Sequence, residues 1–140
     1  MYHLKVEQTF DSAHFLKGYQ GKCSNIHGHT WKVMIIVSSP ILQSEGSCKD
    51  MLEDFGYLKQ NLKDEVNYLD HSLVIESGTL KQSTYDALLD EGFRIVTLPF
   101  RSTAENLSKY FYDKMKSKGY LVTSCIVYET PTNYAEYTKD

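Results

Sequence analysis

The alternation of apolar and polar side chains predicts two β-strands near the start of the chain. In residues 2–10, and again in residues 29–38, apolar side chains recur at alternate positions, which is the pattern of a strand with one buried face. Residues 11–28 between them contain three glycines and many polar side chains, so a long loop is expected there. Two strands joined by one long loop favour an antiparallel pair.

The spacing of apolar residues changes to a helical period in two later stretches. Asp50, with a glutamate three residues on, resembles a capping box and predicts a helix that ends near Asn67. A second capping box at residues 102–105 predicts a helix that ends at Gly119. The apolar stripe of the first helix consists of Met51, Phe55, Leu58, Leu62 and Val66, and that of the second of Leu107, Tyr110, Phe111 and Met115.

The remaining segments give shorter elements and complete the expected architecture. Residues 83–91 indicate a short helix, and residues 95–98 a short strand that ends before a proline. Two more strands are predicted over residues 120–129 and 133–137. The order of the main elements is therefore ββααββ. This order indicates a single α+β domain over residues 1–140, with an antiparallel sheet and the two main helices packed on one face.

Composition and charge narrow the range of functions. The 140 residues are 41% hydrophobic and 24% charged, with a formal net charge of −3. No basic patch or stripe is evident, which argues against a binder of nucleic acid or of a membrane surface. Three cysteines, an odd number, do not make a disulfide framework and suit a reducing compartment. The chain has neither a signal-peptide pattern nor an apolar run of membrane-spanning length, so a soluble cytoplasmic protein is expected.

Three histidines in a short stretch are the strongest chemical signal. His14, His27 and His29 fall within sixteen residues, and three histidines hold zinc in catalytic sites with one coordination position left open. In extended backbone His27 and His29 point to the same face, because they lie two positions apart. Zn²⁺ is the preferred cofactor because imidazole suits it and no carboxylate lies close by in the sequence; iron and nickel remain alternatives.

A thiol lies between these histidines, and its role has two readings. Cys23 has the polar and partly cationic neighbours Lys22, Ser24 and Asn25, which are typical of a reactive thiol rather than of a core thiol. It is either a fourth zinc ligand, which would close the site, or a base or nucleophile beside an open site. The sequence chemistry leaves both readings open.

Three acidic positions have less specific signals. Asp70 directly precedes His71, and a histidine oriented by a carboxylate is the usual proton-transfer unit. The two side chains are able to meet if a turn places them side by side. Glu129 follows an apolar strand and is, from the pattern alone, a strand-end surface charge. Glu105 is interpreted as a helix-capping residue.

Six short motifs occur in order along nearly the whole chain. They are Phe10-Asp11-Ser12-Ala13-His14, Cys23-x3-His27-Gly28-His29, Asp54-Phe55-Gly56-Tyr57-Leu58-Lys59, Leu69-Asp70-His71, Ser102-Thr103-Ala104-Glu105-Asn106 and Glu129-Thr130-Pro131-Thr132. Each is weak alone, but together they resemble the 6-pyruvoyl-tetrahydropterin synthase family, and specifically its 6-carboxytetrahydropterin synthase branch. The three residues between Cys23 and His27 resemble the spacing of that branch, whereas the animal-type pyruvoyl synthases have a longer gap.

The resemblance implies a fold, an assembly and a set of site residues. The fold is the tunnelling fold, in which subunits join their sheets into an oligomeric barrel, commonly a hexamer of two trimers. Zinc is implied on His14, His27 and His29, with Cys23 as the proton-abstracting thiolate. Asp70 and His71 are implied as the proton-relaying pair. Glu129 is implied as the anchor of the amino-pyrimidine edge of the pterin, and Thr103 and Glu105 as further substrate-binding residues.

The reaction implied by the resemblance converts 7,8-dihydroneopterin triphosphate to 6-carboxy-5,6,7,8-tetrahydropterin, acetaldehyde and triphosphate, on the route to queuosine. Two alternatives of the same class are a 6-pyruvoyl-tetrahydropterin synthase and an enzyme that cleaves the side chain of dihydroneopterin. An alternative of another class is a non-catalytic oligomer that binds zinc or pterin. The chain departs from the family where Leu73-Val74-Ile75 replaces a common Leu-Asn pair, and in a longer segment over residues 75–100.

Overall fold

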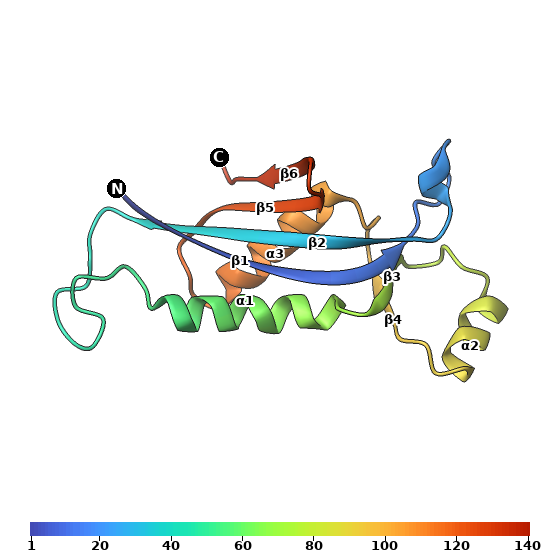
Figure 1. Ribbon diagram of the computed structural model, residues 1–140, viewed down its shortest axis with the longest axis horizontal. Coiled ribbons are helices and arrows are strands. Elements are labelled where there is room, and N and C mark those ends of the chain that lie inside the picture. Colours follow the sequence, from blue (N-terminus) through green and yellow to red (C-terminus); the bar gives the residue numbers. More distant parts are fainter.

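The computed structural model describes all 140 residues and is built around one long antiparallel hairpin. Strands β1 (Tyr2–His14) and β2 (His27–Ser39) pair along their whole length, from Tyr2 opposite Ser39 to His14 opposite His27. The hairpin forms the centre of a six-stranded sheet with the order β4-β3-β1-β2-β5-β6 (Figure 1). Both predicted strands and their antiparallel pairing are confirmed. Each strand is longer than the alternation indicated, so the loop between them is reduced to residues 15–26.

The sheet is mixed, so the prediction of an antiparallel sheet is wrong. Strands β5 (Val122–Thr130) and β6 (Asn133–Tyr137) extend it in the antiparallel sense beyond β2. On the other side, β3 (Ser72–Glu76) and β4 (Ile95–Leu98) run parallel to β1. β2 returns the chain to the start of β1, and a helix then carries it along the sheet to the far end, where β3 continues in the direction of β1 (Figure 1). β3 was not predicted, because five residues are too few to show a clear alternation of apolar and polar side chains.

Two helices cover one face of the sheet, as predicted. Helices α1 (Phe55–Leu69) and α3 (Ala104–Ser117) pack against β1 and β5 respectively. Their buried side chains share one core with alternate residues of the central strands, which is what a sheet with a single apolar face requires. The central members of this core are Val6, Phe10, Trp31, Val33, Ile35, Leu58, Leu62, Val66, Phe111 and Met115.

Both helices begin at caps that differ from the predicted ones. The N-cap of α1 is Asp54, whose side chain accepts a hydrogen bond from the Tyr57 N–H, whereas Asp50 lies in a turn with φ 64°. The N-cap of α3 is Thr103, whose hydroxyl oxygen accepts a hydrogen bond from the Asn106 N–H at 3.2 Å. A single polar residue completes each helix start, so the neighbouring Ser102 is left for another role.

The segment between β3 and β4 makes an excursion away from the sheet. Helix α2 (Gln82–Asp90) has no buried residue and lies apart from the helix layer (Figure 1). The predicted short helix over 83–91 and strand over 95–98 are confirmed by α2 and β4. A single 3-10 turn, η1 (Lys22–Ser24), lies in the loop after β1. No helix combines the length and the apolar composition that crossing a membrane requires.

Candidate active site

The three histidines lie on the paired ends of β1 and β2, so the predicted loop position is wrong for His14 and His27, while His29 lies in a strand as predicted. His14 pairs with His27, and Ser12 pairs with His29. Residues that face each other across an antiparallel pair point to the same side of the sheet, as do alternate residues of one strand. The three imidazoles therefore share the face that carries Trp31 and the core. Their ligand nitrogens all lie within 4.8 Å of one another.

The outer nitrogen of each ring points into this shared space without a partner. The Nε2 atoms of His14, His27 and His29 are buried and make no hydrogen bond. The Nδ1–H of His14 donates to the carbonyl oxygen of Ser102 at 2.9 Å and lies 3.1 Å from its hydroxyl, and that of His27 donates to the Asn25 carbonyl at 2.7 Å. A proton held on Nδ1 leaves the Nε2 lone pair free. In metal sites, a hydrogen bond donated by the other ring nitrogen orients the histidine in this way. The donor set therefore fits a metal ion.

Burial keeps the rings of His14 and His29 in the neutral form that binds metals. Desolvation lowers the pKa of His14 to about 4, against an opposing contribution from the Ser102 carbonyl. Desolvation also lowers the pKa of His29, although the carboxylate of Glu129 acts in the opposite direction. An imidazole must be unprotonated to bind a metal, so these two rings are ready for binding at neutral pH.

A carboxylate distant in the sequence completes this cluster. Glu129, near the end of β5, has its Oε1 atom 3.7 Å from the Nε2 atom of His29, and its side chain is 24% exposed. It lines a cleft of about 510 Å³ together with His29, Thr30, Lys32 and Tyr128. The interpretation of Glu129 as a surface charge is therefore wrong, because the residue faces the histidines. It was not recognised as their neighbour because one hundred residues separate it from His29.

The thiol of Cys23 lies outside the ligand cluster. Cys23 is half-buried in η1, where its carbonyl accepts a hydrogen bond from the Leu16 N–H at 2.9 Å. Its sulfur is not among the atoms that lie within 4.8 Å of one another at the three histidines. In this geometry Cys23 does not close the site as a fourth ligand.

The Asp70–His71 pair is formed directly after α1. The Nδ1–H of His71 donates to Oδ2 of Asp70 at 2.9 Å, while Oδ1 of Asp70 accepts the Asp11 N–H at 2.8 Å. His71 has φ 53°, a left-handed conformation that costs a non-glycine residue about 1–2 kcal/mol. This turn is what brings two consecutive side chains together. Desolvation acts to raise the pKa of Asp70, but the bonds from Asp11 and His71 outweigh it and lower the pKa.

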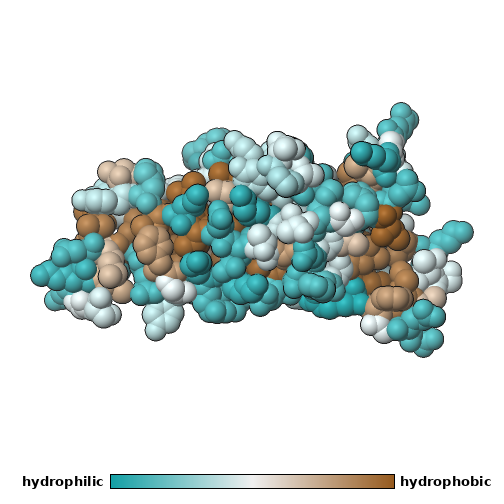
Figure 2. Space-filling view, viewed as in Figure 1, coloured by the Kyte–Doolittle hydropathy of each residue, from teal (hydrophilic) through white to brown (hydrophobic).

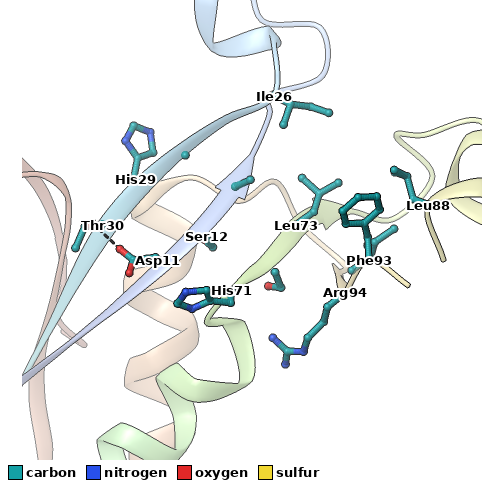
Figure 3. A pocket seen from close by; sticks show the side chains of 14 residues that line it. Asp11, Ser12, Ile26, His29, Thr30, His71, Leu73, Leu88, Phe93 and Arg94 are labelled. Carbon is teal, nitrogen blue, oxygen red and sulfur yellow. Dashed lines mark hydrogen bonds between the residues drawn. The ribbon is translucent and has the colours of Figure 1, made fainter. Parts of the chain in front are cut away.

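This pair and the histidine cluster do not converge within one chain. Asp11 pairs with Thr30, the residue directly after His29 on β2. Consecutive residues of a strand point to opposite faces, so the Asp11 and Thr30 side chains, which share a hydrogen bond, lie on the face of the sheet opposite to the three histidines. Figure 3 shows the His29 ring on the other side of β2 from Asp11 and His71. Asp11, Asp70 and His71 form a second, separate group of titratable side chains.

An open depression of about 720 Å³ borders the second group, and His29 of the histidine cluster also contributes to its lining. Asp11, His71 and Arg94 lie on its polar side, and Ile26, Leu73, Leu88 and Phe93 supply apolar walls (Figure 3). Ile26 and Phe93 are 60% and 58% exposed, which leaves apolar surface open at the end of the molecule that carries α2 (Figure 2). Apolar surface of this kind marks a contact site.

Two predicted substrate residues make no contact with either cluster, and one unpredicted residue does. Thr103 caps α3, and Glu105 is exposed in its first turn. Ser102, which is only 1% exposed, instead fixes the His14 ring. The sequence signal for this role was a small polar residue, Ser102, directly before the helix cap. From the sequence alone, Ser102 is instead interpreted as the first residue of the capping box.

Comparison with known proteins places the chain in a class. Residues 3–140 match the sequence profile of the 6-pyruvoyl tetrahydropterin synthase family. The chain is 34% identical to the 6-carboxy-5,6,7,8-tetrahydropterin synthase of Haemophilus influenzae, over 98% of this chain and 99% of that one. It is 33% identical to the enzyme of the same name from Aquifex aeolicus, over 85% of this chain and 77% of that one.

Solved structures agree on the fold. An uncharacterized protein from Wolinella succinogenes superposes with a TM-score of 0.80 at 21% identity, over 99% of this chain and 98% of that one. The 6-pyruvoyl tetrahydropterin synthase of Plasmodium falciparum gives 0.71 at 22% identity, over 99% and 97%. The fold is therefore that of the tetrahydropterin synthases, the tunnelling fold. The chain belongs to the 6-pyruvoyl tetrahydropterin synthase family and is an enzyme of the pterin synthase class.

Proposed function

We propose that this protein is a zinc-dependent lyase that converts 7,8-dihydroneopterin triphosphate and water to 6-carboxy-5,6,7,8-tetrahydropterin, acetaldehyde and triphosphate, in queuosine biosynthesis. The observation that carries the proposal is the convergence of three buried, unpartnered Nε2 atoms in a chain of this family. The choice of reaction rests on the relatives that are named 6-carboxy-5,6,7,8-tetrahydropterin synthase and on the spacing of Cys23 and His27. A cytoplasmic location accords with free thiols and modest charge.

Zinc is assigned to His14, His27 and His29. Their chemistry favours it because imidazole nitrogens are common zinc ligands, and three protein ligands leave a coordination position for substrate. Bound there, the ion would supply Lewis acidity toward the oxygens of the substrate side chain. Neighbouring residues hold the rings in place. The carbonyls of Ser102 and Asn25 orient the rings of His14 and His27, and Trp31 packs edge-on against His14 and His29.

Glu129 is the proposed anchor of the pterin ring. Its carboxylate lies beside the histidine cluster and lines the cleft that also contains Tyr128 and Thr130. A carboxylate accepts two parallel hydrogen bonds from neighbouring N–H groups, and the amino-pyrimidine edge of a pterin presents such a pair. This contact would fix the ring so that its side chain reaches the histidines. The substrate contacts of Thr103 and Glu105 stay predictions.

Cys23 is the proposed base, and Asp70 with His71 the proposed proton-relaying pair. The thiol lies on the loop that joins the two histidine-bearing strands, and it is not one of the ligand atoms of the cluster. His71 is 78% exposed at its side chain and is held by Asp70, as a group that exchanges protons with a substrate must be accessible and oriented.

The arrangement favours active sites shared between chains. Because His71 points away from the histidines of its own chain, it would have to serve the cluster of a neighbour. The outer strands β4 and β6 each leave one edge of the sheet unpaired, and unpaired edges attract further strands. We propose a homo-oligomeric barrel, a hexamer of two trimers, in which the apolar depression beside His71 is covered by a second copy.

Product analysis tests the reaction. Purified protein loaded with zinc is incubated with 7,8-dihydroneopterin triphosphate, and acetaldehyde, triphosphate and the pterin products are measured separately. Acetaldehyde and triphosphate in equal amounts support the proposal. Release of triphosphate without acetaldehyde would identify a pyruvoyl-type synthase instead. Cleavage of the pterin side chain without release of triphosphate would identify an aldolase-like enzyme. Calorimetric binding of substrate with no product at all would identify a non-catalytic binder.

A further inference from the structure

The end of α1 carries backbone carbonyls that the helix itself leaves without partners. The last four carbonyls of any helix lack an intrahelical donor, and α1 has no basic residue in its own last turn. Its C-cap is Asp70, and the next residue is His71 in the left-handed conformation. The proposed proton-relaying pair therefore sits on a helix end that needs donors from elsewhere.

One side chain from a distant segment supplies two of those donors. The guanidinium of Arg94 donates through one nitrogen to the carbonyl oxygen of Asp70, at 2.8 Å, and through the other to that of Tyr68. It also lies over the Tyr68 ring, with its central carbon 5.8 Å from the ring centroid. A planar, permanently charged fork makes two such bonds at once, and its positive charge complements the negative end of the helix dipole.

The chain around Arg94 is itself tied to the strand that follows the pair. The Arg94 carbonyl accepts a hydrogen bond from the Leu73 N–H at 3.0 Å, two residues after His71. Gly92, with φ 87°, ends α2 and turns the chain back toward β4. The excursion through α2 thus delivers Arg94 to the helix end from a fixed backbone position (Figure 3).

We infer that Arg94 is a positioning residue for the reaction, which clamps the turn that holds Asp70 and His71 in register. Its two bonds bracket the backbone just before the left-handed residue, so they fix the direction of the His71 ring. The inference rests on the proposed function, because it takes Asp70 and His71 to be the proton-relaying pair. It assigns a role to the segment over residues 75–100, whose length departs from the family pattern.

The test compares Arg94→Ala, Arg94→Lys and a matched control, Lys118→Ala. Lys118 is also a cation that donates to a carbonyl of α1, that of Asn61 at 3.4 Å, but it lies away from the pair. With the full-length, zinc-loaded protein, Arg94→Ala should lower kcat about 10- to 100-fold, because small misplacements of a proton-transfer group have effects of that size. KM should stay within about twofold, and Arg94→Lys should recover part of kcat through one of the two bonds.

Nuclear magnetic resonance of the histidine side chains gives a reading that needs no substrate. The signal of the His71 Nδ1–H proton, donated to Asp70, should shift or broaden in Arg94→Ala and stay unchanged in Lys118→Ala. Unchanged kcat and an unchanged His71 signal in Arg94→Ala would overturn the inference. A rise in KM with constant kcat would also overturn it, since Arg94 would then bind substrate directly. If the wild-type protein releases no acetaldehyde, the proposed function fails, while the His71 signal still decides whether Arg94 positions the ring.

Discussion

Two clusters of titratable side chains lie at the same end of the molecule but are held in opposite ways. His14, His27 and His29 rise from paired strand ends, and their free nitrogens are buried. Asp70 and His71 occupy a turn after α1, where the His71 side chain is 78% exposed. A metal needs several ligands fixed in advance, which paired strands provide. A proton-transfer pair instead needs access to its substrate, and here access comes with a strained backbone that depends on hydrogen bonds from other segments.

Removing one member of each cluster should separate metal binding from proton transfer. His27→Ala takes away a proposed ligand, so zinc content should fall below one-tenth of wild type, with activity lost. His71→Ala should also abolish most acetaldehyde release, by about 100-fold or more, but should keep full zinc. Metal analysis beside a coupled acetaldehyde assay measures both. Full zinc in His27→Ala would remove that residue from the ligand set.

Mixing these two inactive variants tests whether the clusters of different chains meet. If each site takes its histidines from one chain and its Asp70–His71 pair from another, random one-to-one mixing leaves about a quarter of the sites with both halves intact. Unfolding and refolding the mixture should therefore restore activity that neither variant has alone. Each variant refolded by itself is the control, and a mixture as inactive as its parents would show that the sites are not shared.

Substitutions of Cys23 and of Glu129 should impair the enzyme in different ways, because the two residues have different proposed roles. Cys23→Ala removes the proposed proton acceptor, so kcat should fall about 100-fold or more while substrate still binds. Glu129→Ala removes charge-assisted bonds worth roughly 1.5–3 kcal/mol each, so affinity should fall at least about tenfold. Calorimetry with substrate and the acetaldehyde assay separate the two effects, with zinc content unchanged in both. A Cys23→Ala enzyme of near wild-type rate would show that the thiol is not the base.

Ser102 and Thr103 are neighbours with separate predicted effects. Ser102→Ala removes the hydroxyl beside the His14 Nδ1 atom but leaves the carbonyl, so zinc affinity should fall by about tenfold. Thr103→Ala removes the α3 N-cap and should lower the free energy of unfolding by about 1 kcal/mol without weakening zinc. Competition with a chromophoric chelator and denaturant titration provide the two measurements. Equal zinc affinity in both variants would contradict the role given to Ser102.

Acid should destabilise the zinc-free protein through His14. Its pKa is about 4 in the folded chain against 6.5 ordinarily, so between these values the unfolded state binds more protons. The free energy of unfolding should therefore decrease as pH falls from about 6.5 to about 4, by about 1–3 kcal/mol from this group. Denaturant titrations of wild type and of His14→Gln across this range isolate the contribution, and parallel pH profiles of the two proteins would contradict it.

The elements that depend on local periodicity were predictable from the sequence. The alternation before and after the histidines predicted β1 and β2, and the helical stripes predicted the bodies of α1 and α3. The two-residue spacing of His27 and His29 correctly placed both rings on one face. These features are readable because side chains a few residues apart on one strand or helix share a face whatever the rest of the chain does.

Contacts between distant segments were not predictable from local patterns and are seen only in the folded chain. The approach of Glu129 to His29, the hydrogen bond from His14 to Ser102 and the parallel pairing of β3 with β1 join residues that are far apart in the sequence. The same is true of the separation of Asp70 and His71 from the histidine cluster. Such pairings depend on how α1 and α3 pack over the whole sheet, because many strand orders bury the same apolar faces. A pattern within one segment records which of its sides is buried, but it does not specify the segment that buries it.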